Sequence, residues 1–343
     1  MPGTSPPRAT DAVRASRAPA IAWTWRNALF ALVAAAPAVL VTVFDPASGL
    51  ALGVGVLPAI AVGVLPRRRQ RVLLLIAGAV AGASMFVGSL VANTPVLAVV
   101  TVFVLCVVLA VAATNPMRRL LPAVLNVGPA LVGAGLSESG PVGGATMGLL
   151  ILSGSVFVWL LSLLWPDRPA PPARDRAPLD RATMFRYGLQ IGAAGAAAAA
   201  LGFASGVDHP GWACAAALLV SRPDDGLLRS RAWGRAVAVV VGALVACTVA
   251  ATTPTSLALA VVLALTLMAV GGTRGSRWYV TPAFSTTIVL SMLMVGQTGV
   301  EAHWFLERVG QTLVGVALAL LALGGARLLT RSAGPGPRYA PAP

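Results

Sequence analysis

The sequence has no lysine, few charged residues and few residues that could hold a metal or form a disulfide. All 25 basic residues in its 343 are arginine, and charged residues make up 10% of the chain against 57% hydrophobic residues. A soluble domain carries roughly 25% charged residues, so this composition points to a membrane protein. The cysteines, Cys106, Cys214 and Cys247, lie in apolar segments without metal-ligand spacing or a disulfide pattern. We therefore expect no metal and no cofactor.

Motifs of the common enzymes and of nucleic-acid-binding proteins are also missing from the sequence. There is no Gly-Lys phosphate loop or Ser-His-Asp set, and the 11 acidic residues are peripheral. The net charge of +14 is not accompanied by a basic face with interleaved aromatic residues. We predict that the protein is not an enzyme and does not bind nucleic acid.

Long apolar runs dominate the chain instead. "RVLLLIAGAVAGASMFVGSLVA" and "PVLAVVTVFVLCVVLAVAA" approach or reach the ~20 residues that a helix needs to cross ~30 Å of hydrocarbon. Their lack of alternation excludes barrel strands. We predict an all-α polytopic membrane protein with twelve transmembrane helices, at about 27–44, 49–65, 71–92, 95–113, 118–136, 142–165, 184–205, 209–221, 232–252, 254–272, 279–296 and 304–326.

The arginines fall into alternate loops of this arrangement. They occupy the N-terminal segment, "PRRRQR", "NPMRR", the central linker, "SRPDDGLLRSRAWGR", "GGTRGSR" and the C-terminal tail, whereas the loops between these have none. Positive charge in short loops marks the cytoplasmic side of a membrane, so both termini are predicted to be cytoplasmic. Of the 25 arginines, only Arg308 falls on the other side.

Composition divides the chain into five parts. Residues 1–26 are rich in Pro, Arg and Ser and are expected to be a disordered cytoplasmic tail. A Pro- and Arg-rich cytoplasmic linker at 166–181 separates a first six-helix repeat at 27–165 from a second at 182–330. Residues 331–343 form a second cytoplasmic tail.

Two short patterns occur in both halves. Arg71 precedes Gly78 by seven residues in "RVLLLIAG", and Arg235 precedes Gly242 by seven residues in "RAVAVVVG". The arginines are 164 residues apart, which nearly matches the offset of 160 residues in the second pattern. We therefore predict an internal duplication. An even number of helices per half predicts parallel repeats, related by an axis along the membrane normal.

The second pattern contains proline and polar residues. "LLPAVLNVGPALVG" resembles "YVTPAFSTTIVLSM", which aligns Pro122 with Pro282 and Asn126 with Thr286. Helices broken by Pro or Gly at equivalent positions are typical of a substrate site between repeats, so these four residues and Ser285 are candidates for a substrate path. The alternative is that hydroxyl groups bond to their own or a neighbouring helix, and that Pro and Gly are simply common in membrane helices.

The last predicted helix starts with polar residues. His303, Glu307 and Gln311 are spaced by four and form one stripe, and Arg308 and Thr312 form an adjoining stripe. Two such stripes need a polar partner helix or a water-filled path, and a cation at the outer end would attract an organic carboxylate. The alternative is that Glu307 and Arg308 anchor the helix at the membrane interface or serve helix packing.

Four further charged or titratable residues have simpler interpretations. Arg71 and Arg235 are expected to fix helix ends against phospholipid headgroups. Asp208 and His209 precede the short helix at 209–221. A role in proton coupling is open because His titrates near neutral pH, but a solvated loop is favoured.

Two segments resemble the fusaric-acid-resistance (FUSC) family and the related aromatic acid exporters. "DHPGWACAAALLVSRPDDGLLRSRAWGRAVAVVVGALVA" resembles the core signature of the family, and "ERVGQTLVG" resembles its second block. The resemblance covers most of 27–330 and departs from the family pattern at Ala238, Val239 and Gln311. The positions that carry it are Trp212, Pro223, Arg235, Gly242, Arg308, Thr312 and Gly315.

The resemblance implies an inner- or plasma-membrane transporter that exports small organic anions, aromatic carboxylic acids or similar toxic compounds, driven by a gradient. Its partners would be the phospholipid bilayer and a small organic anion, and homo-oligomerisation is left open. One alternative is an anion channel or uniporter, since a related plant family conducts malate. The other is a structural or envelope-assembly membrane protein without transport.

Overall fold

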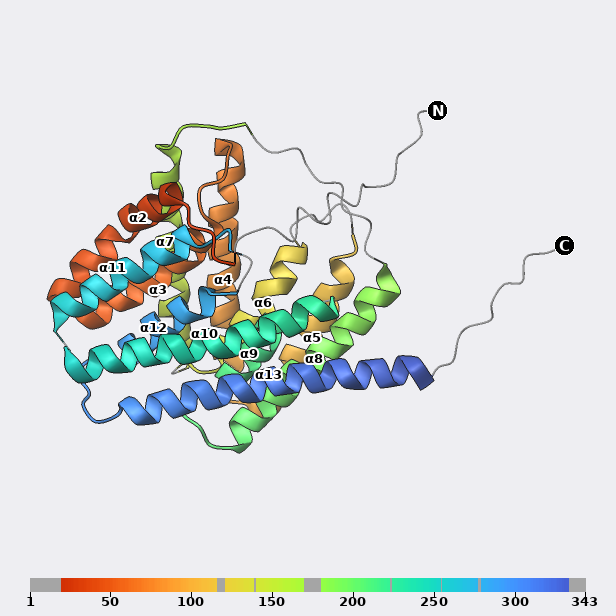
Figure 1. The fold of residues 1–343 in the computed structure, drawn as a ribbon. Coiled ribbons are helices and arrows are strands. Elements are labelled where there is room, and N and C mark those ends of the chain that lie inside the picture. The colour runs from red at the N-terminus through yellow and green to blue at the C-terminus, as the bar shows by residue number, and fades with distance from the viewer. Residues whose placement is uncertain are drawn as a thin grey trace, which may run out of the picture.

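The computed structural model describes residues 20–115, 121–138, 140–169, 180–222, 224–253, 255–276 and 279–332. Throughout these ranges the regular structure is helical, which confirms the predicted all-α polytopic membrane fold (Figure 1). The helices are α2 (Trp25–Phe44), α3 (Pro46–Val62), η1 (Arg68–Arg71), α4 (Val72–Val91), α5 (Pro95–Ala112), α6 (Leu121–Gly135), α7 (Pro141–Leu163), α8 (Arg181–Ala204), α9 (Gly211–Val220), α10 (Asp225–Thr252), α11 (Ser256–Gly272), α12 (Thr281–Leu293) and α13 (Glu301–Ser332).

The α-helices are of two lengths. In the described ranges α2, α4 with its η1 turn, α5, α7, α8, α10 and α13 are long and apolar enough to cross a membrane, whereas α3, α6, α9, α11 and α12 are shorter apolar helices of 10–17 residues. At 1.5 Å per residue, the 10 residues of α9 span only about 15 Å, or half the hydrocarbon thickness. All twelve predicted helices are therefore present, but seven of them have the length of a full membrane crossing.

Caps and prolines determine where several helices begin. The side chains of Asp45, Asp180, Asp224 and Thr255 each accept a hydrogen bond from a backbone N–H in the first turn of the following helix. This satisfies one of the donors that a helix start leaves unpaired. α3, α5 and α7 have proline in the first turn, where its missing N–H costs nothing.

The start of α10 differs from the prediction. Asp224 caps a helix that begins at Asp225, seven residues before the predicted start at 232, so the segment assigned to a loop is helical. Arg235 consequently lies ten residues inside α10, about 15 Å from its first residue. The expectation that Arg235 fixes a helix end is wrong. α13 is also longer than predicted, running from Glu301 to Ser332 rather than over 304–326.

Within each half of the chain the helices pack in the same pairs. In the first half α4 packs on α6 and α7, and α3 packs on α2 and α7. In the second half α10 packs on α12 and α13, and α9 packs on α8 and α13. These pairs correspond one to one when the helices of the two halves are matched in chain order.

The two halves are interlocked rather than separate. α5 of the first half packs on α8 of the second, and α11 of the second half packs on α2 of the first. Between them, α6 packs on α9 and α12 packs on α3. The two largest apolar cores accordingly each contain side chains from both halves. All four helices of these inner contacts, α3, α6, α9 and α12, belong to the short class.

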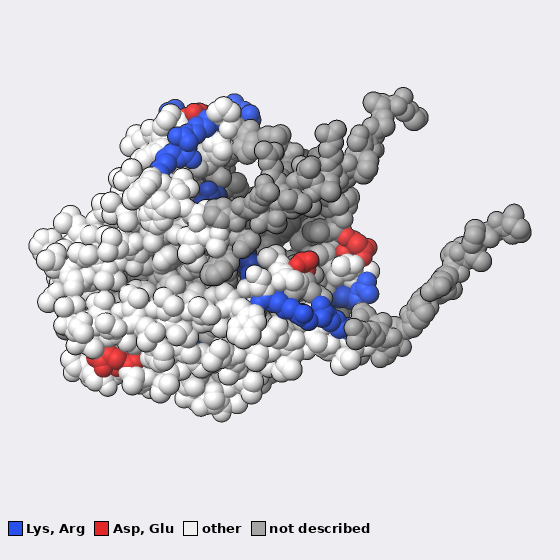
Figure 2. Space-filling view, viewed as in Figure 1, with Lys and Arg blue, Asp and Glu red and all other residues white. Residues whose placement is uncertain are grey.

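The surface is mostly apolar. On the face shown in Figure 2, arginine side chains are confined to the upper and right-hand edges, and the broad area between carries little charge apart from an acidic patch at the lower left. Large hydrophobic side chains of α2, α5, α10 and α13 are exposed along this and other faces. An apolar surface of this extent requires lipid contact, so the chain is a multi-pass membrane protein.

Candidate functional site

A stack of three side chains lies where the start of α13 meets the start of α9. The Arg308 side chain is directed into the protein and the residue is only 8% exposed. Its guanidinium lies 4.6 Å above the ring centroid of Trp212. The His209 ring stacks on Trp212 with centroids 4.1 Å apart and an interplanar angle of 12°. The interpretation of Arg308 as an interfacial anchor is therefore wrong, because its charge is buried among aromatic side chains.

Glu307 points to the loop before α9 instead of to its neighbour Arg308. Its side chain is 6% exposed, and its Oε1 accepts a hydrogen bond of 2.8 Å from the backbone N–H of His209. The same oxygen is 3.5 Å from His209 Nδ1. Burial lowers the pKa of His209, and the nearby Glu307 carboxylate acts in the opposite direction. His209 is therefore part of a buried cluster, not of the solvated loop that the sequence favoured.

A second buried guanidinium approaches from α10. Arg235 is 4% exposed and interacts electrostatically with the Tyr279 side chain, which precedes α12. Its positive charge is close enough to Arg308 for the two to interact electrostatically. The Nε atoms of both arginines are buried without a hydrogen-bond partner. Among the described residues, no carboxylate lies within 4.0 Å of either guanidinium.

Arg71, the residue that the sequence aligned with Arg235, has a different environment. It is fully buried, and it donates hydrogen bonds to the carbonyl oxygens of Leu65, Ser162, Trp165 and Pro166 at 2.6–3.1 Å. Its Nη2 is also 3.2 Å from Asp167 Oδ1. Arg71 therefore ties the start of α4 to the end of α7, through protein carbonyls and not through lipid headgroups.

The remaining polar residues of α13 have distinct roles. The Thr312 hydroxyl donates to the carbonyl of Arg308 at 2.9 Å, which is the bond to its own helix that we considered as the alternative. Gln311 is buried one turn beyond Glu307. His303 is exposed at the helix start, and its Nε2 is 2.7 Å from Asp208 Oδ2.

The hydroxyl groups of α12 also divide into two kinds. Ser285 bonds to the carbonyl of Pro282 in its own helix at 3.3 Å, and Thr287 bonds to the carbonyl of Gly242 in α10 at 3.1 Å. Thr286 and Ser291 are buried, and their hydroxyl oxygens have no partner in the described part of the chain. Thr286 is thus available to a ligand or a water molecule, whereas Ser285 is engaged in its own helix.

The candidates in α6 are not part of the same cluster. α6, which contains Asn126, packs mainly on α4, α5 and α9, whereas α12 packs on α10, α11 and α3. The aligned residues Asn126 and Thr286 therefore lie in different helix contacts. The side chain of Pro122 lies outside the described residues, as does Pro223 of the family signature.

The two glycines of the family signature allow helices to approach closely. A Cβ added to Gly242 would lie 2.2 Å from the Ala283 carbonyl oxygen in α12. A Cβ added to Gly315 would lie 2.2 Å from the Ala213 carbonyl oxygen in α9. Both glycines bring their helices against the elements that carry Tyr279 and Trp212, so they position the arginine cluster without contacting it.

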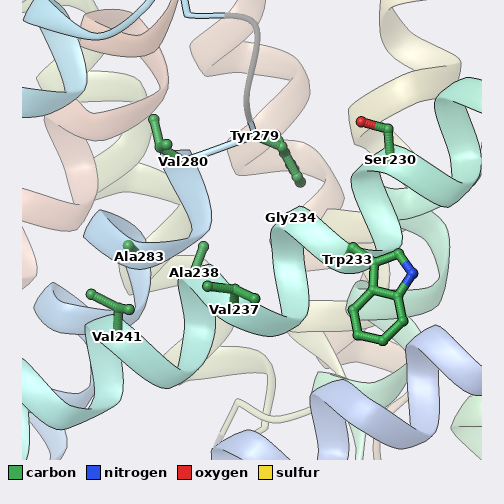
Figure 3. A pocket seen from close by; sticks show the side chains of 9 residues that line it. All are labelled: Ser230, Trp233, Gly234, Val237, Ala238, Val241, Tyr279, Val280 and Ala283. Atoms are coloured by element: carbon green, nitrogen blue, oxygen red, sulfur yellow. The ribbon is translucent and has the colours of Figure 1, made fainter. Parts of the chain in front are cut away.

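A groove of about 420 Å³ runs between α10 and α12 (Figure 3). Its walls are mostly apolar, and Tyr279 projects toward α10 at one side of it, opposite Gly234. A Cβ at Gly234 would lie 3.1 Å from the Tyr279 Cβ, so glycine leaves room for this approach. Tyr279 lines the groove and interacts electrostatically with Arg235, although neither Arg235 nor Arg308 lines the groove itself.

The sequence did not single out Tyr279 and did not connect His209 with Arg308. One available signal was that the chain contains only two histidines, His209 and His303. Both lie at the same end of the bundle, and both rings contact Trp304, at centroid distances of 5.2 and 5.0 Å.

Comparison with known families identifies the region that contains this cluster. A family model described as fusaric acid resistance protein-like matches residues 196–322, from the second half of α8 to most of α13. No curated protein and no solved structure matches the chain. The match includes the predicted signature positions from Trp212 to Gly315 and confirms the resemblance. Residues 196–322 are therefore similar to the fusaric acid resistance protein-like family.

Proposed function

We propose that this protein is a gradient-driven transporter of the inner or plasma membrane that exports small organic anions, with aromatic carboxylates as the main class. Arg308 and Arg235 bind the carboxylate of the substrate. The observation that carries the proposal is that two interacting guanidiniums are buried in the protein without a carboxylate partner in its described part.

The unpaired charges favour an anionic ligand for electrostatic reasons. A single arginine at the centre of a membrane helix costs roughly 2.5–3.5 kcal/mol on insertion scales, and a second nearby positive charge adds repulsion. A carboxylate between the two would remove both penalties. Guanidinium groups recognise carboxylates with paired N–H donors, and the free Nε–H of each arginine supplies such a donor.

The apolar groove favours an aromatic substrate. Its volume of about 420 Å³ lies in the range of small-molecule sites, roughly 300–1,000 Å³, which combine apolar walls with a few polar groups. Val237, Val280 and Ala283 would surround a ring, and the phenol of Tyr279 would lie between the ring and Arg235. Trp233, at the mouth of the groove, is 76% exposed on the surface that faces lipid in a bilayer, so an amphipathic acid could enter from the membrane.

Movement of the two halves of the chain relative to each other would expose this site alternately to the two sides of the membrane. The matching packing pairs of the two halves support the predicted internal repeat. The short helices α3, α6, α9 and α12 lie where the halves meet, and short or broken helices at such a seam are typical of transporters built from repeats. The arginine-rich loops favour cytoplasmic termini, which would place the Glu307 end of α13 on the outer side.

An efflux assay with purified protein in liposomes tests the proposal. Vesicles are loaded with radiolabelled benzoate, a pH gradient is applied, and release is compared between the unchanged protein, Arg308→Gln, Arg235→Gln and the control Arg229→Gln. Arg229 is an exposed arginine on the same helix as Arg235. We expect release by the unchanged and control proteins and loss of release in the other two.

Other outcomes discriminate between the alternatives. If an uncoupler leaves release unchanged and a benzoate conductance is measured across a planar bilayer, the protein is an anion channel and export against a gradient is refuted. If the protein releases none of a panel of aromatic and aliphatic acids, and Arg308→Gln does not change the resistance of cells to these acids, the protein has a structural role and the proposal fails.

A further inference from the structure

The two histidines of the chain come together with two carboxylates at the Glu307 end of the bundle. Asp208 and His209 belong to the loop between α8 and α9, and His303 and Glu307 lie in the first two turns of α13. His303 Nε2 is 2.7 Å from Asp208 Oδ2 and 3.7 Å from Glu307 Oε2. One ligand atom from each of Asp208, His303 and Glu307 lies within 4.8 Å of the others.

The Glu307 side chain supplies an independent sign of a missing ligand. Only 6% of the side chain is exposed, and its Oε2 has no hydrogen-bond partner among the described residues. Its other oxygen is fixed by the backbone N–H of His209, so the carboxylate cannot turn away without losing that bond. A buried carboxylate oxygen without a donor is costly. Oε2 faces His303, which is the direction in which a cation would compensate it.

We propose that Asp208, His303 and Glu307 form a binding site for a divalent transition metal of the zinc class. Imidazole nitrogen and carboxylate oxygen are ligands that Zn²⁺ takes at roughly 2.0–2.2 Å. A tetrahedral arrangement at these lengths separates ligand atoms by about 3.4 Å. The separations of 2.7 and 3.7 Å must therefore change by less than about 1 Å, and the separation between Asp208 and Glu307 by at most about 1.4 Å. Asp208 and His303 have side chains more than half exposed and can make this adjustment, while the buried Glu307 stays fixed.

The metal would stabilise the contact between the start of α13 and the loop before α9. Three ligands leave a fourth position for water or for His209, whose buried Nδ1 has no hydrogen bond and is 3.5 Å from Glu307 Oε1. Sequence spacing reveals only the pair His303 and Glu307, because Asp208 is 95 residues before His303 and approaches it only in the folded chain. The metal ligands are different residues from the proposed carboxylate-binding arginines, although Glu307 is the neighbour of Arg308 and interacts with its charge, and metal binding does not depend on transport.

Metal titration of the purified protein in nanodiscs tests the proposal. The affinity tag is removed, so that His209 and His303 are the only imidazoles in the sample. Zn²⁺ binding is measured by isothermal titration calorimetry at pH 7.5, and Co²⁺ is added separately because its visible absorption reports nitrogen and oxygen ligands. We expect one Zn²⁺ per chain with a micromolar or lower Kd.

Three variants decide the outcome. His303→Ala and Asp208→Asn change exposed side chains and should each weaken Zn²⁺ binding at least tenfold, with the thermal unfolding temperature of the metal-free protein unchanged. The control Glu301→Gln removes a carboxylate from the first turn of the same helix outside the cluster and should bind Zn²⁺ normally. Absence of saturable binding below 100 µM Zn²⁺, or equal affinity in His303→Ala and the unchanged protein, overturns the proposal. If the unchanged protein binds Zn²⁺ but releases no benzoate, only the proposed transport function is refuted.

Discussion

Replacing Arg308 by glutamine tests whether this arginine binds a ligand or only stabilises the fold. Arg308 has no carboxylate partner in the described ranges and stacks on Trp212. A hydrogen bond to a charged group contributes about 1.5–3 kcal/mol. Because about 1.4 kcal/mol corresponds to a tenfold change in affinity, Arg308→Gln should weaken binding of an aromatic carboxylate by about tenfold to 150-fold.

The same substitution should have little effect on folding. It loses a cation–π contact worth about 0.5–2 kcal/mol, and it removes a buried charge whose cost is below the roughly 3 kcal/mol of the membrane centre, because Arg308 lies near one end of α13. These changes oppose each other, so we expect the free energy of unfolding to change by no more than about 1 kcal/mol.

Arg71→Gln is the matched control for this experiment. Arg71 donates to four carbonyl oxygens and approaches Asp167, and removing one member of a buried charged network costs about 3–5 kcal/mol. Arg71→Gln should therefore lower the unfolding temperature and the yield of folded protein. Binding is measured by scintillation proximity with labelled benzoate, and stability by thermal unfolding in detergent. The reasoning is refuted if Arg308→Gln unfolds as readily as Arg71→Gln, or if it binds benzoate with unchanged affinity.

Three further substitutions or conditions have definite expected outcomes. Tyr279→Phe removes the hydroxyl that interacts with Arg235 and lines the groove, and it should weaken benzoate binding by about threefold to tenfold, the effect of one hydrogen bond of roughly 0.5–1.5 kcal/mol; unchanged affinity would exclude this tyrosine from the site. Gly315→Leu places side-chain atoms against a backbone carbonyl of α9 and should abolish monodisperse protein in size-exclusion chromatography, whereas Gly310→Leu, which has open space around it, should not; equal yields of the two would contradict the packing. Burial lowers the pKa of His209 in the folded protein, so as the pH falls the unfolded chain takes up this proton at a higher pH than the folded protein does. The free energy of unfolding is therefore highest above the unfolded pKa of about 6.5 and decreases as the pH falls below it. Unfolding temperatures measured from pH 8 to pH 5 should fall in this window, and less so in His209→Gln; a flat profile in the unchanged protein would refute this role of burial.

Much of the fold follows from the composition of local segments. Helices α2, α4, α5 and α7 lie within about two residues of their predicted limits because Pro, Asp and charged residues end each apolar run abruptly. The prediction was wrong at the start of α10, where Asp224 caps a helix that continues through Asp225, Arg229 and Arg231 of a segment read as a loop. Hydropathy cannot detect such a helix, because charged residues are compatible with a helix outside the membrane.

The candidate site was predicted in part. The four-residue spacing along α13 places His303, Glu307 and Gln311 on one face whatever surrounds the helix, and Arg308 was singled out as an exception in the arginine pattern. The spacing to glycine could not distinguish Arg71 from Arg235, since both precede a glycine by seven residues, and only the family resemblance singled out Arg235. Four carbonyl oxygens surround one of them and a tyrosine hydroxyl approaches the other.

The sequence by itself determined that this chain is an all-helical membrane protein and which helix surfaces are polar, because hydrophobic length and helical periodicity are local properties. Only the tertiary structure decided which of those polar groups have a hydrogen-bond or charge partner within the protein. Hydrogen bonds and charge pairs at α9, α10, α12 and α13 form between residues up to about a hundred positions apart, and their distances depend on how the helices pack. Whether an arginine is structural or available to a ligand depends on those distances, and no local pattern contains them.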